Sequence, residues 1–260
     1  MAKIIAVYNI KGGVGKTTSA VNLAYLSAQS GQQTLLWDMD HQGAAGFFLN
    51  NDSTLKGGLK GMMKDVTLPA SKRTIADKVV ATDYENLDLL PSDMSMRLLD
   101  VKTAEARSSN NLMKKLLAPL DGQYDTIIVD CAPGLTAANV SLMHAADLVL
   151  VPVIPTVLSV RMLEQLNDFV KSDIHEKTGD KKPKLRAFFT MMDGRKLMHK
   201  SIFEQLCVKK KTIVLPVSIP YQSSTEKMAL HQKPLAEFAA SSTAAIAYND
   251  LWAAVKRMRF

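Results

Sequence analysis

The segment KGGVGKTT, residues 11–18, constrains the fold of this chain more than any other feature. It follows an apolar, strand-like run and precedes a helix-like run. Lys16 and Thr17 match the invariant pair of the phosphate-loop pattern G-x-x-x-x-G-K-[ST], while Ile10 occupies the place of the first glycine. A glycine-rich turn from a strand into a helix predicts a loop that binds the phosphates of a nucleotide.

Each residue type in this loop suits contact with a polyphosphate. The glycines allow positive φ and close backbone approach, so successive N–H groups can point at phosphate oxygens. The N-terminus of the following helix adds partial positive charge. Lys16 is expected to reach the β- and γ-phosphates, and the Thr17 hydroxyl to ligate Mg²⁺. The residues expected to bind the nucleotide are Gly12, Gly13, Val14, Gly15, Lys16, Thr17 and Thr18.

Strand-like and helix-like runs alternate along the whole chain. The strand-like runs cover residues 4–8, 34–37, 87–90, 126–129, 148–151, 185–190 and 213–217. This alternation predicts an α/β fold with a mostly parallel, twisted sheet and helices on both faces. The length of 260 residues fits a single domain over residues 1–260. The polar stretch at residues 50–73 predicts loops and short helices rather than a second domain.

Acidic residues follow two of the strand-like runs. Asp38 and Asp40 come after the second run, and Asp130 ends the fourth. Open α/β sheets bind ligands at the carboxyl ends of their strands, so these carboxylates and the glycine-rich loop are expected to converge. Asp130 is suited to hold Mg²⁺ opposite the loop threonine, with a strand-terminal cap as the alternative interpretation.

The formal net charge of +7 favours a polyanionic partner, with nucleic acid as the first candidate. Basic residues gather in the second half of the chain, although any one group alone could be a solvated face. The groups are Lys181, Lys182, Lys184 and Arg186; Arg195, Lys196 and Lys200; Lys209, Lys210 and Lys211; and Lys256, Arg257 and Arg259.

Apolar runs and cysteines bear on the expected compartment. No apolar run is long enough to span a bilayer, and the first one is too short for a signal peptide. The two cysteines give neither a disulfide framework nor the spacing of zinc ligands. The sequence therefore predicts a cytoplasmic protein.

These motifs together resemble the ParA/MinD family of deviant Walker ATPases, and within it the ParA branch. The loop has the additional lysine of that family, Lys11. The segments LLWDMDHQG at 35–43, TIIVDCAPG at 126–134 and TMMDGRK at 190–196 are similar to further family motifs, and residues 218–234 resemble its C-terminal half. The resemblance thus covers nearly the whole chain.

The resemblance implies a P-loop ATPase that uses ATP and Mg²⁺ and forms a homodimer when ATP is bound. Lys11 would contact phosphates bound by the other subunit, and Asp40 would orient or activate the attacking water. The catalytic set is therefore Lys11, Lys16 and Asp40, while Asp38 joins the shell of the metal. Arg195 would contact DNA through phosphates, without reading its sequence.

The resemblance also implies a cellular role. The ATP-bound dimer would associate with the nucleoid, and a ParB-like or cargo-adaptor protein would stimulate hydrolysis and release it. The cargo would be a plasmid, a chromosome origin or a protein organelle such as a carboxysome. The sequence does not choose among these cargoes, because the partner makes the contact with the cargo.

The chain departs from the family pattern at several positions. His41 stands where proline is usual. Ser223 and Ser224 stand where ParA relatives commonly have a second DNA-contacting arginine. Lys227, Lys233 or the C-terminal basic residues could take the place of that arginine.

Two other kinds of protein with this fold are alternatives. Cys131 is another departure from the family pattern, and it suggests the nitrogenase iron protein as one alternative. The iron–sulfur cluster of that protein lies between two subunits and needs two suitably placed cysteines per chain. The second cysteine here, Cys207, lies instead in the lysine-rich half. A MinD-like membrane ATPase is the other alternative, because apolar residues between Ile246 and Met258 can share a helix face beside basic residues. A closing helix packed on the sheet is the favoured interpretation of that segment.

Overall fold

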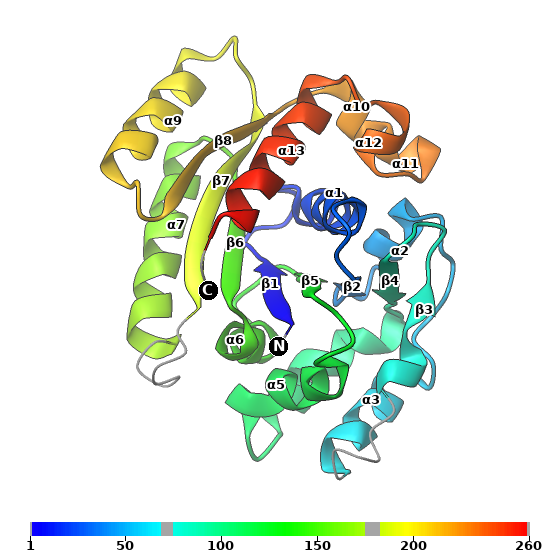
Figure 1. Cartoon of the computed structure of the whole chain (residues 1–260). Helices are drawn as coiled ribbons and strands as arrows, with labels where there is room; N and C mark the ends of the chain where they lie inside the picture. The colour runs from blue at the N-terminus through cyan, green and yellow to red at the C-terminus, as the bar shows by residue number, and fades with distance from the viewer. Residues whose placement is uncertain (1, 69–74, 175–182, 259–260) are drawn as a thin grey trace.

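One eight-stranded sheet forms the centre of the molecule (Figure 1). The computed structural model describes residues 2–68, 75–174 and 183–258. The strand order is β3-β4-β2-β5-β1-β6-β7-β8, and all neighbours pair in parallel except β3 and β4. The strands are β1 (Lys3–Val7), β2 (Thr34–Asp38), β3 (Val80–Ala81), β4 (Leu87–Leu90), β5 (Thr126–Asp130), β6 (Leu148–Val153), β7 (Lys184–Met192) and β8 (Val214–Pro220).

Helices cover both faces of this sheet, as the sequence predicts (Figure 1). One face carries α1 (Lys16–Gln29), α2 (Ala44–Phe48), α11 (Met228–His231), α12 (Leu235–Phe238) and α13 (Thr243–Lys256). The other carries α3 (Gly58–Thr67), α4 (Leu99–Ala104), α5 (Leu112–Leu117), α6 (Ala137–Ala145), α7 (Val157–Phe169) and α9 (Leu197–Lys209). The remaining helical segments are η2 (Ile75–Lys78), η3 (Met94–Leu98), η4 (Ser109–Asn111), η5 (Ala118–Leu120), η6 (Val170–Ile174) and α10 (Ser223–Glu226).

The central strands are apolar because both of their faces are buried. Along β1, Ile5 and Val7 join the core under α1, whereas Ala6 joins the core on the opposite face. This period of two places successive side chains in different cores. A parallel sheet covered on both faces therefore reads as continuous apolar runs in the sequence.

Some elements differ from the sequence expectation. Strand β3 was missed, because two residues at an edge give no pattern. Helix α3 has ten residues where loops and short helices were expected; Leu59 and Met62, which are buried, anchor it. Helix α1 begins at Lys16, whereas the helix-like run in the sequence covers Ser19 to Ala28. The expectation for residues 69–73 lies outside the described residues.

The last helix, α13, packs against α1 and β8. Leu251, Trp252 and Val255 are buried in the core. Three of the apolar side chains that a lipid-binding helix would expose are thus already covered, whereas Ile246 is 51% exposed and Met258 is partly buried. In the described ranges, no helix is long and apolar enough to cross a bilayer.

Candidate nucleotide-binding site

The loop between β1 and α1 lies at the carboxyl edge of the sheet. Gly13 and Gly15 have φ of 68° and 86°, which residues with a Cβ rarely adopt. Gly15 is also the N-cap of α1, so the first N–H groups of the helix face the loop. The carbonyl of Val14 accepts a hydrogen bond from Thr190 Oγ1 at 2.9 Å. Strand β7 therefore holds the loop in this cradle conformation.

Lys16 lies beneath the loop instead of extending into solvent. Its side chain is buried, and Nζ donates to the Lys11 carbonyl oxygen at 3.1 Å. Burial lowers the pKa of the Lys16 ammonium, while the nearby Asp130 and Asp40 carboxylates oppose this shift. An added Cβ at Gly13 would meet no surrounding atom within 4 Å, so open space adjoins the loop at this residue.

A buried asparagine that sequence analysis did not identify supports the start of the loop. Asn9 Nδ2 donates to the Pro152 carbonyl oxygen at 2.7 Å, and its Oδ1 accepts from the Lys11 N–H at 2.9 Å. Strand β6 thereby positions Lys11, the residue predicted to reach the other subunit. Asn9 could have been identified from the sequence, because it is a polar residue between an apolar strand and a glycine-rich loop.

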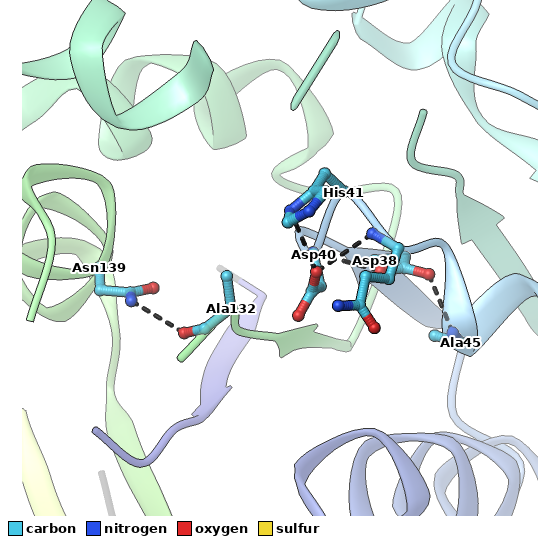
Figure 2. Close-up of polar contacts among 7 residues, drawn as sticks. Asp38, Asp40, His41, Ala45, Ala132 and Asn139 are labelled. Atoms are coloured by element: carbon cyan, nitrogen blue, oxygen red, sulfur yellow. Dashed lines mark hydrogen bonds and ion pairs between the residues drawn. The ribbon is translucent and has the colours of Figure 1, made fainter. Parts of the chain in front are cut away.

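Two carboxylates stand side by side where β2 and β5 end. The parallel register aligns Asp38 with Asp130. Asp38 Oδ2 accepts from the N–H groups of Ala45 at 2.9 Å and Gly46 at 3.3 Å, and Oδ1 accepts from Asp40 N–H at 3.2 Å (Figure 2). Burial raises the pKa of Asp38 to about 7, against the opposing effect of these N–H groups. Asp38 caps α2 in this arrangement, and its role in the metal shell stays a prediction.

Asp130 is the carboxylate whose surroundings fit a magnesium ion. It is fully buried, and neither oxygen has a hydrogen-bond partner of ordinary geometry in the described part of the chain. Burial raises its pKa well above the ordinary value and Asp38 adds to the rise, whereas the Thr17 hydroxyl and Lys16 oppose it. Burial of a carboxylate that these two groups stabilise only in part is costly, and a cation would compensate the cost. Carboxylate and hydroxyl oxygens are ligands that Mg²⁺ prefers.

Asp40 is more accessible than the other two carboxylates. Its side chain is 16% exposed, and Oδ1 accepts from Gln42 N–H at 3.1 Å. The same oxygen lies 3.4 Å from His41 Nδ1 (Figure 2). The histidine that replaces the usual proline therefore contacts the carboxylate predicted to orient water. That catalytic role of Asp40 stays a prediction.

The loop after β5 is hydrogen-bonded to the phosphate loop. Gly134 N–H donates to the Ile10 carbonyl oxygen at 3.0 Å, and the Gly134 carbonyl accepts from Tyr8 Oη at 3.1 Å. Asn139 Nδ2 donates to the Ala132 carbonyl oxygen at 3.0 Å (Figure 2). The same nitrogen donates to the Gly134 carbonyl oxygen at 2.8 Å. Displacement of one loop therefore acts on the other.

Cys131 faces the core at the start of this loop. It is buried, and burial raises the pKa of its thiol well above the ordinary value. Its sulfur points to the Val129 carbonyl oxygen at 3.7 Å. Cys207 lies away from this loop, on α9. A cluster shared between subunits would need exposed cysteines, so this position of Cys131 does not favour the iron-protein alternative.

A cavity of about 220 Å³ adjoins the phosphate loop on the β7–β8 side. Its lining is largely apolar beside a few polar groups, which suits a nucleobase next to the phosphates. Of the lining residues, sequence analysis identified Gly15 and Thr18 as nucleotide-binding. It missed the others, because only the order β1-β6-β7-β8 brings them to the loop. They include Met191, Ile219, Pro220 and Tyr221.

Arg195 lies apart from this site, in the turn after β7. Its Nε and Nη2 donate to Asp193 Oδ1 at 3.0 Å and Oδ2 at 3.1 Å, and its side chain is 88% exposed. Hydrogen bonding to Arg195 lowers the pKa of Asp193 to about 2. The structure thus brings the other predicted site residues together and leaves Arg195 on a separate surface, where DNA contact stays a prediction.

Known proteins are similar to this chain in sequence and in fold. The family described as AAA domain matches residues 2–186. The chain is 30% identical over 251 residues to the sporulation initiation inhibitor protein Soj of Bacillus subtilis, covering 96% of this chain and 97% of Soj. It is 30% identical over 241 residues to the chromosome partitioning protein ParA of Myxococcus xanthus, covering 90% and 81%.

A solved structure of similar fold contains a nucleotide. The crystal structure of cobyrinic acid a,c-diamide synthase from Mycobacterium smegmatis has a bound ATP analog and magnesium. Its TM-score with this chain is 0.80 at 27% identity, and the match covers 99% of this chain and 95% of that one.

Proposed function

The chain belongs to the ParA/MinD family of P-loop ATPases, and we propose that its ATP-bound dimer binds DNA without sequence preference. It is an ATPase that uses Mg²⁺, of the ParA-like partition or positioning type. A ParB-like or adaptor partner connects it to the cargo and stimulates hydrolysis. The cargo is a plasmid, a chromosome origin or a protein organelle.

The observation that carries this function is a buried lysine, Lys16, at the start of α1 near a buried carboxylate, Asp130, at the end of β5. The Asp130 oxygens have no hydrogen-bond partner of ordinary geometry among the described residues. Lys16 and the loop N–H groups bind the phosphates, while Thr17 and Asp130 hold the metal. When bound, Mg²⁺ neutralises phosphate charge as hydrolysis proceeds. Asp40, which remains accessible, orients the attacking water.

Exposed apolar residues beside the nucleotide site support a dimer that forms face to face. Leu135, Val157 and Leu158 are 49%, 71% and 58% exposed. They follow β5 and β6 and so lie at the same edge of the sheet as the loop that carries Lys11. A second copy of the chain would cover these side chains and bring its Lys11 to the opposite phosphates.

The exposed basic residues on α9 and near α11 support the DNA contact. Lys196 and Lys200 are exposed beside Arg195, at the start of α9. Lys227 and Lys233, which could replace the missing arginine, are exposed as well. Contacts of this kind with phosphates give affinity without base readout. The resulting location is the nucleoid.

Three measurements on the purified protein test this function. We expect Mg²⁺-dependent ATP hydrolysis, a doubling of mass by light scattering with ATP, and retention on two unrelated DNA duplexes with ATP but not with ADP. DNA binding that ignores the nucleotide, or strong preference for one duplex, would contradict the proposal. Binding to anionic vesicles in place of DNA would favour the MinD-like alternative.

A further inference from the structure

Tyr8 is the first residue after β1, and its side chain contacts the loop that follows β5. The ring is fully buried in the core on the α6 face of the sheet. Its hydroxyl donates to the Gly134 carbonyl oxygen at 3.1 Å. Burial raises the pKa of this hydroxyl well above its ordinary value, so Tyr8 keeps its proton and remains a donor at neutral pH.

Packing alone does not account for the Tyr8 hydroxyl. A phenylalanine ring would fill the same space in the core, whereas a buried hydroxyl is costly unless it forms a hydrogen bond. The Gly134 carbonyl does not depend on Tyr8 for a partner, because Asn139 Nδ2 donates to the same oxygen at 2.8 Å. The hydroxyl is therefore a second donor to a carbonyl that already has one, and its effect is to fix where that peptide group lies.

Gly134 is held by residues from different parts of the chain. Asn139 belongs to α6 and Tyr8 follows β1. The Gly134 N–H donates to the Ile10 carbonyl oxygen at 3.0 Å, at the start of the phosphate loop. Its φ is 97°, which a residue with a Cβ rarely adopts. These hydrogen bonds fix the peptide groups on both sides of Gly134, and the second of these groups joins it to Leu135.

The side chain that follows this fixed peptide lies on the surface proposed for the dimer. Leu135 is 49% exposed. Next to Tyr8 in the chain, Asn9 positions Lys11, because its Oδ1 accepts from the Lys11 N–H at 2.9 Å. One stretch of the chain thus connects Lys11 with Leu135 through hydrogen bonds. A second copy has to meet both side chains at once, so their relative position affects how tightly it binds.

We infer that Tyr8 is a positioning residue for assembly, whose hydroxyl orients the peptide after Gly134 so that Leu135 faces the second subunit together with Lys11. The inference rests on the proposed function, because it assumes the face-to-face dimer. Tyr8 acts through the loop after β5 and not by contact with the nucleotide. With the hydroxyl in place this loop is preorganised in the monomer, so less conformational entropy is lost when two copies bind.

Tyr8→Phe tests this role, since it removes the hydroxyl and keeps the ring. Light scattering over a dilution series, with Mg²⁺ and a slowly hydrolysed ATP analogue, measures the dimer. We expect the variant to dimerise roughly three- to tenfold more weakly than the wild type, which is the range that one hydrogen bond allows. Its monomer should bind the analogue within about twofold of the wild type, because the loop N–H groups and Lys16 remain.

Tyr124→Phe is the matched control. Tyr124 Oη donates to Asp88 Oδ2 at 2.8 Å, at the amino end of β5 and so at the opposite end of the strand from the loop. This variant also loses one hydroxyl hydrogen bond, so its melting temperature should fall by an amount similar to that of Tyr8→Phe. Its ATP-dependent dimer should be as tight as that of the wild type.

Amide hydrogen exchange reports the position of the loop directly and needs no dimer. In the nucleotide-free protein, the Gly134 N–H should exchange at least about threefold faster in Tyr8→Phe than in the wild type, because the loop opens more often. The Cys131 N–H, which donates to the Val7 carbonyl oxygen at 3.3 Å, should exchange at the wild-type rate.

Several outcomes would overturn the inference. Unchanged exchange at Gly134 in Tyr8→Phe would show that the hydroxyl does not hold the loop. Faster exchange with a dimer as tight as that of the wild type would exclude the role in assembly. Dimers weakened equally by the Tyr8 and Tyr124 substitutions would indicate a general loss of stability. A wild type that stays monomeric with ATP would reject the proposed dimer itself, and the exchange at Gly134 would still show whether Tyr8 holds the loop.

Discussion

The phosphate-loop region and the turn after β7 hold their charges in opposite ways. Lys16, Asp38 and Asp130 are buried at the first, and backbone groups fix two of them. At the second, the exposed Arg195 side chain forms an ion pair with Asp193 at the surface, where the Asp193 side chain is 16% exposed. A buried charge requires a partner or a ligand, whereas an exposed pair contributes little to stability. The first region is therefore built around a ligand, and the second can change its partners without disturbing the fold.

The largest effect is expected from Lys16→Ala. The loop would lose the cation that meets the phosphates, and we expect ATP affinity to fall by at least about 100-fold. Titration with a fluorescent ATP analogue measures this change. Lys200→Ala removes the same charge from the exposed start of α9 and should leave ATP affinity unchanged. Equal ATP affinity in the two variants would contradict the inference that the phosphate-loop region is built around a ligand and the surface near α9 is not.

Asp40→Ala should separate binding from chemistry within the first region. The phosphate cradle stays intact, so ATP binding and dimer formation should persist, while loss of the water-orienting carboxylate slows hydrolysis by about 10²–10⁴-fold. Phosphate release under single-turnover conditions is the measurement. Hydrolysis by Asp40→Ala at the wild-type rate would show that Asp40 is not the catalytic carboxylate, and Asp38 would be the next candidate.

Lys11→Ala tests the lysine that is predicted to act on the other subunit. The variant should bind ATP within about threefold of the wild type, since the loop N–H groups and Lys16 remain. Its ATP-dependent dimer should be at least about tenfold weaker, because a charge-assisted contact with the opposite phosphates is missing. Light scattering with and without ATP gives the result. A dimer as tight as that of the wild type would exclude a role in trans.

Substitutions in the exposed pair should change DNA binding and nothing else. Arg195→Glu should weaken DNA affinity several-fold and lower the log–log salt slope by about 0.9 for each lost phosphate contact. Asp193→Asn removes the carboxylate that competes for Arg195, so it should bind DNA at least as well as the wild type. Titrations at about 50 and 200 mM salt measure both. Unchanged DNA binding by Arg195→Glu would place the DNA contact elsewhere.

The smallest expected effect is a change in stability at Asp130. Burial raises the pKa of this carboxyl in the folded protein, so ionisation opposes folding. Protonated Asp130 contributes fully to the free energy of unfolding below about pH 4. This contribution is lost as the pH rises toward the pKa that Asp130 has in the folded protein. Asp130→Asn should therefore raise the melting temperature of the nucleotide-free protein at about pH 8 but not at about pH 4. The expected rise is roughly 2–4 °C for each kcal/mol by which the free energy of unfolding increases.

The melting temperature of Asp130→Asn is also measured with Mg²⁺ and ATP present. They should raise the melting temperature of the wild type but have a much smaller effect on Asp130→Asn, because the metal loses a ligand. A melting temperature of the variant that is lower than that of the wild type at every pH would show that the Asp130 carboxylate has a structural partner.

The fold and the phosphate site could be predicted because each depends on local pattern. Loop residues such as Gly13 and Lys16 adjoin one another in sequence, and the parallel strands are apolar runs. The cavity on the β7–β8 side of the phosphate loop could not be predicted, since Met191 and Tyr221 reach the loop only through the strand order. The capping of α2 by Asp38 was missed as well, because a carboxylate after a strand has the same pattern whether it holds a metal or a helix.

The hydrogen bond from Lys16 to the Lys11 carbonyl joins the two lysines of the loop through the backbone. An ammonium has three N–H donors, so Lys16 can contact a phosphate and keep this bond. One loop thus holds both the residue expected to bind the nucleotide and the residue predicted to cross to the other subunit. A shift at the first can reach the second without passing through any other element.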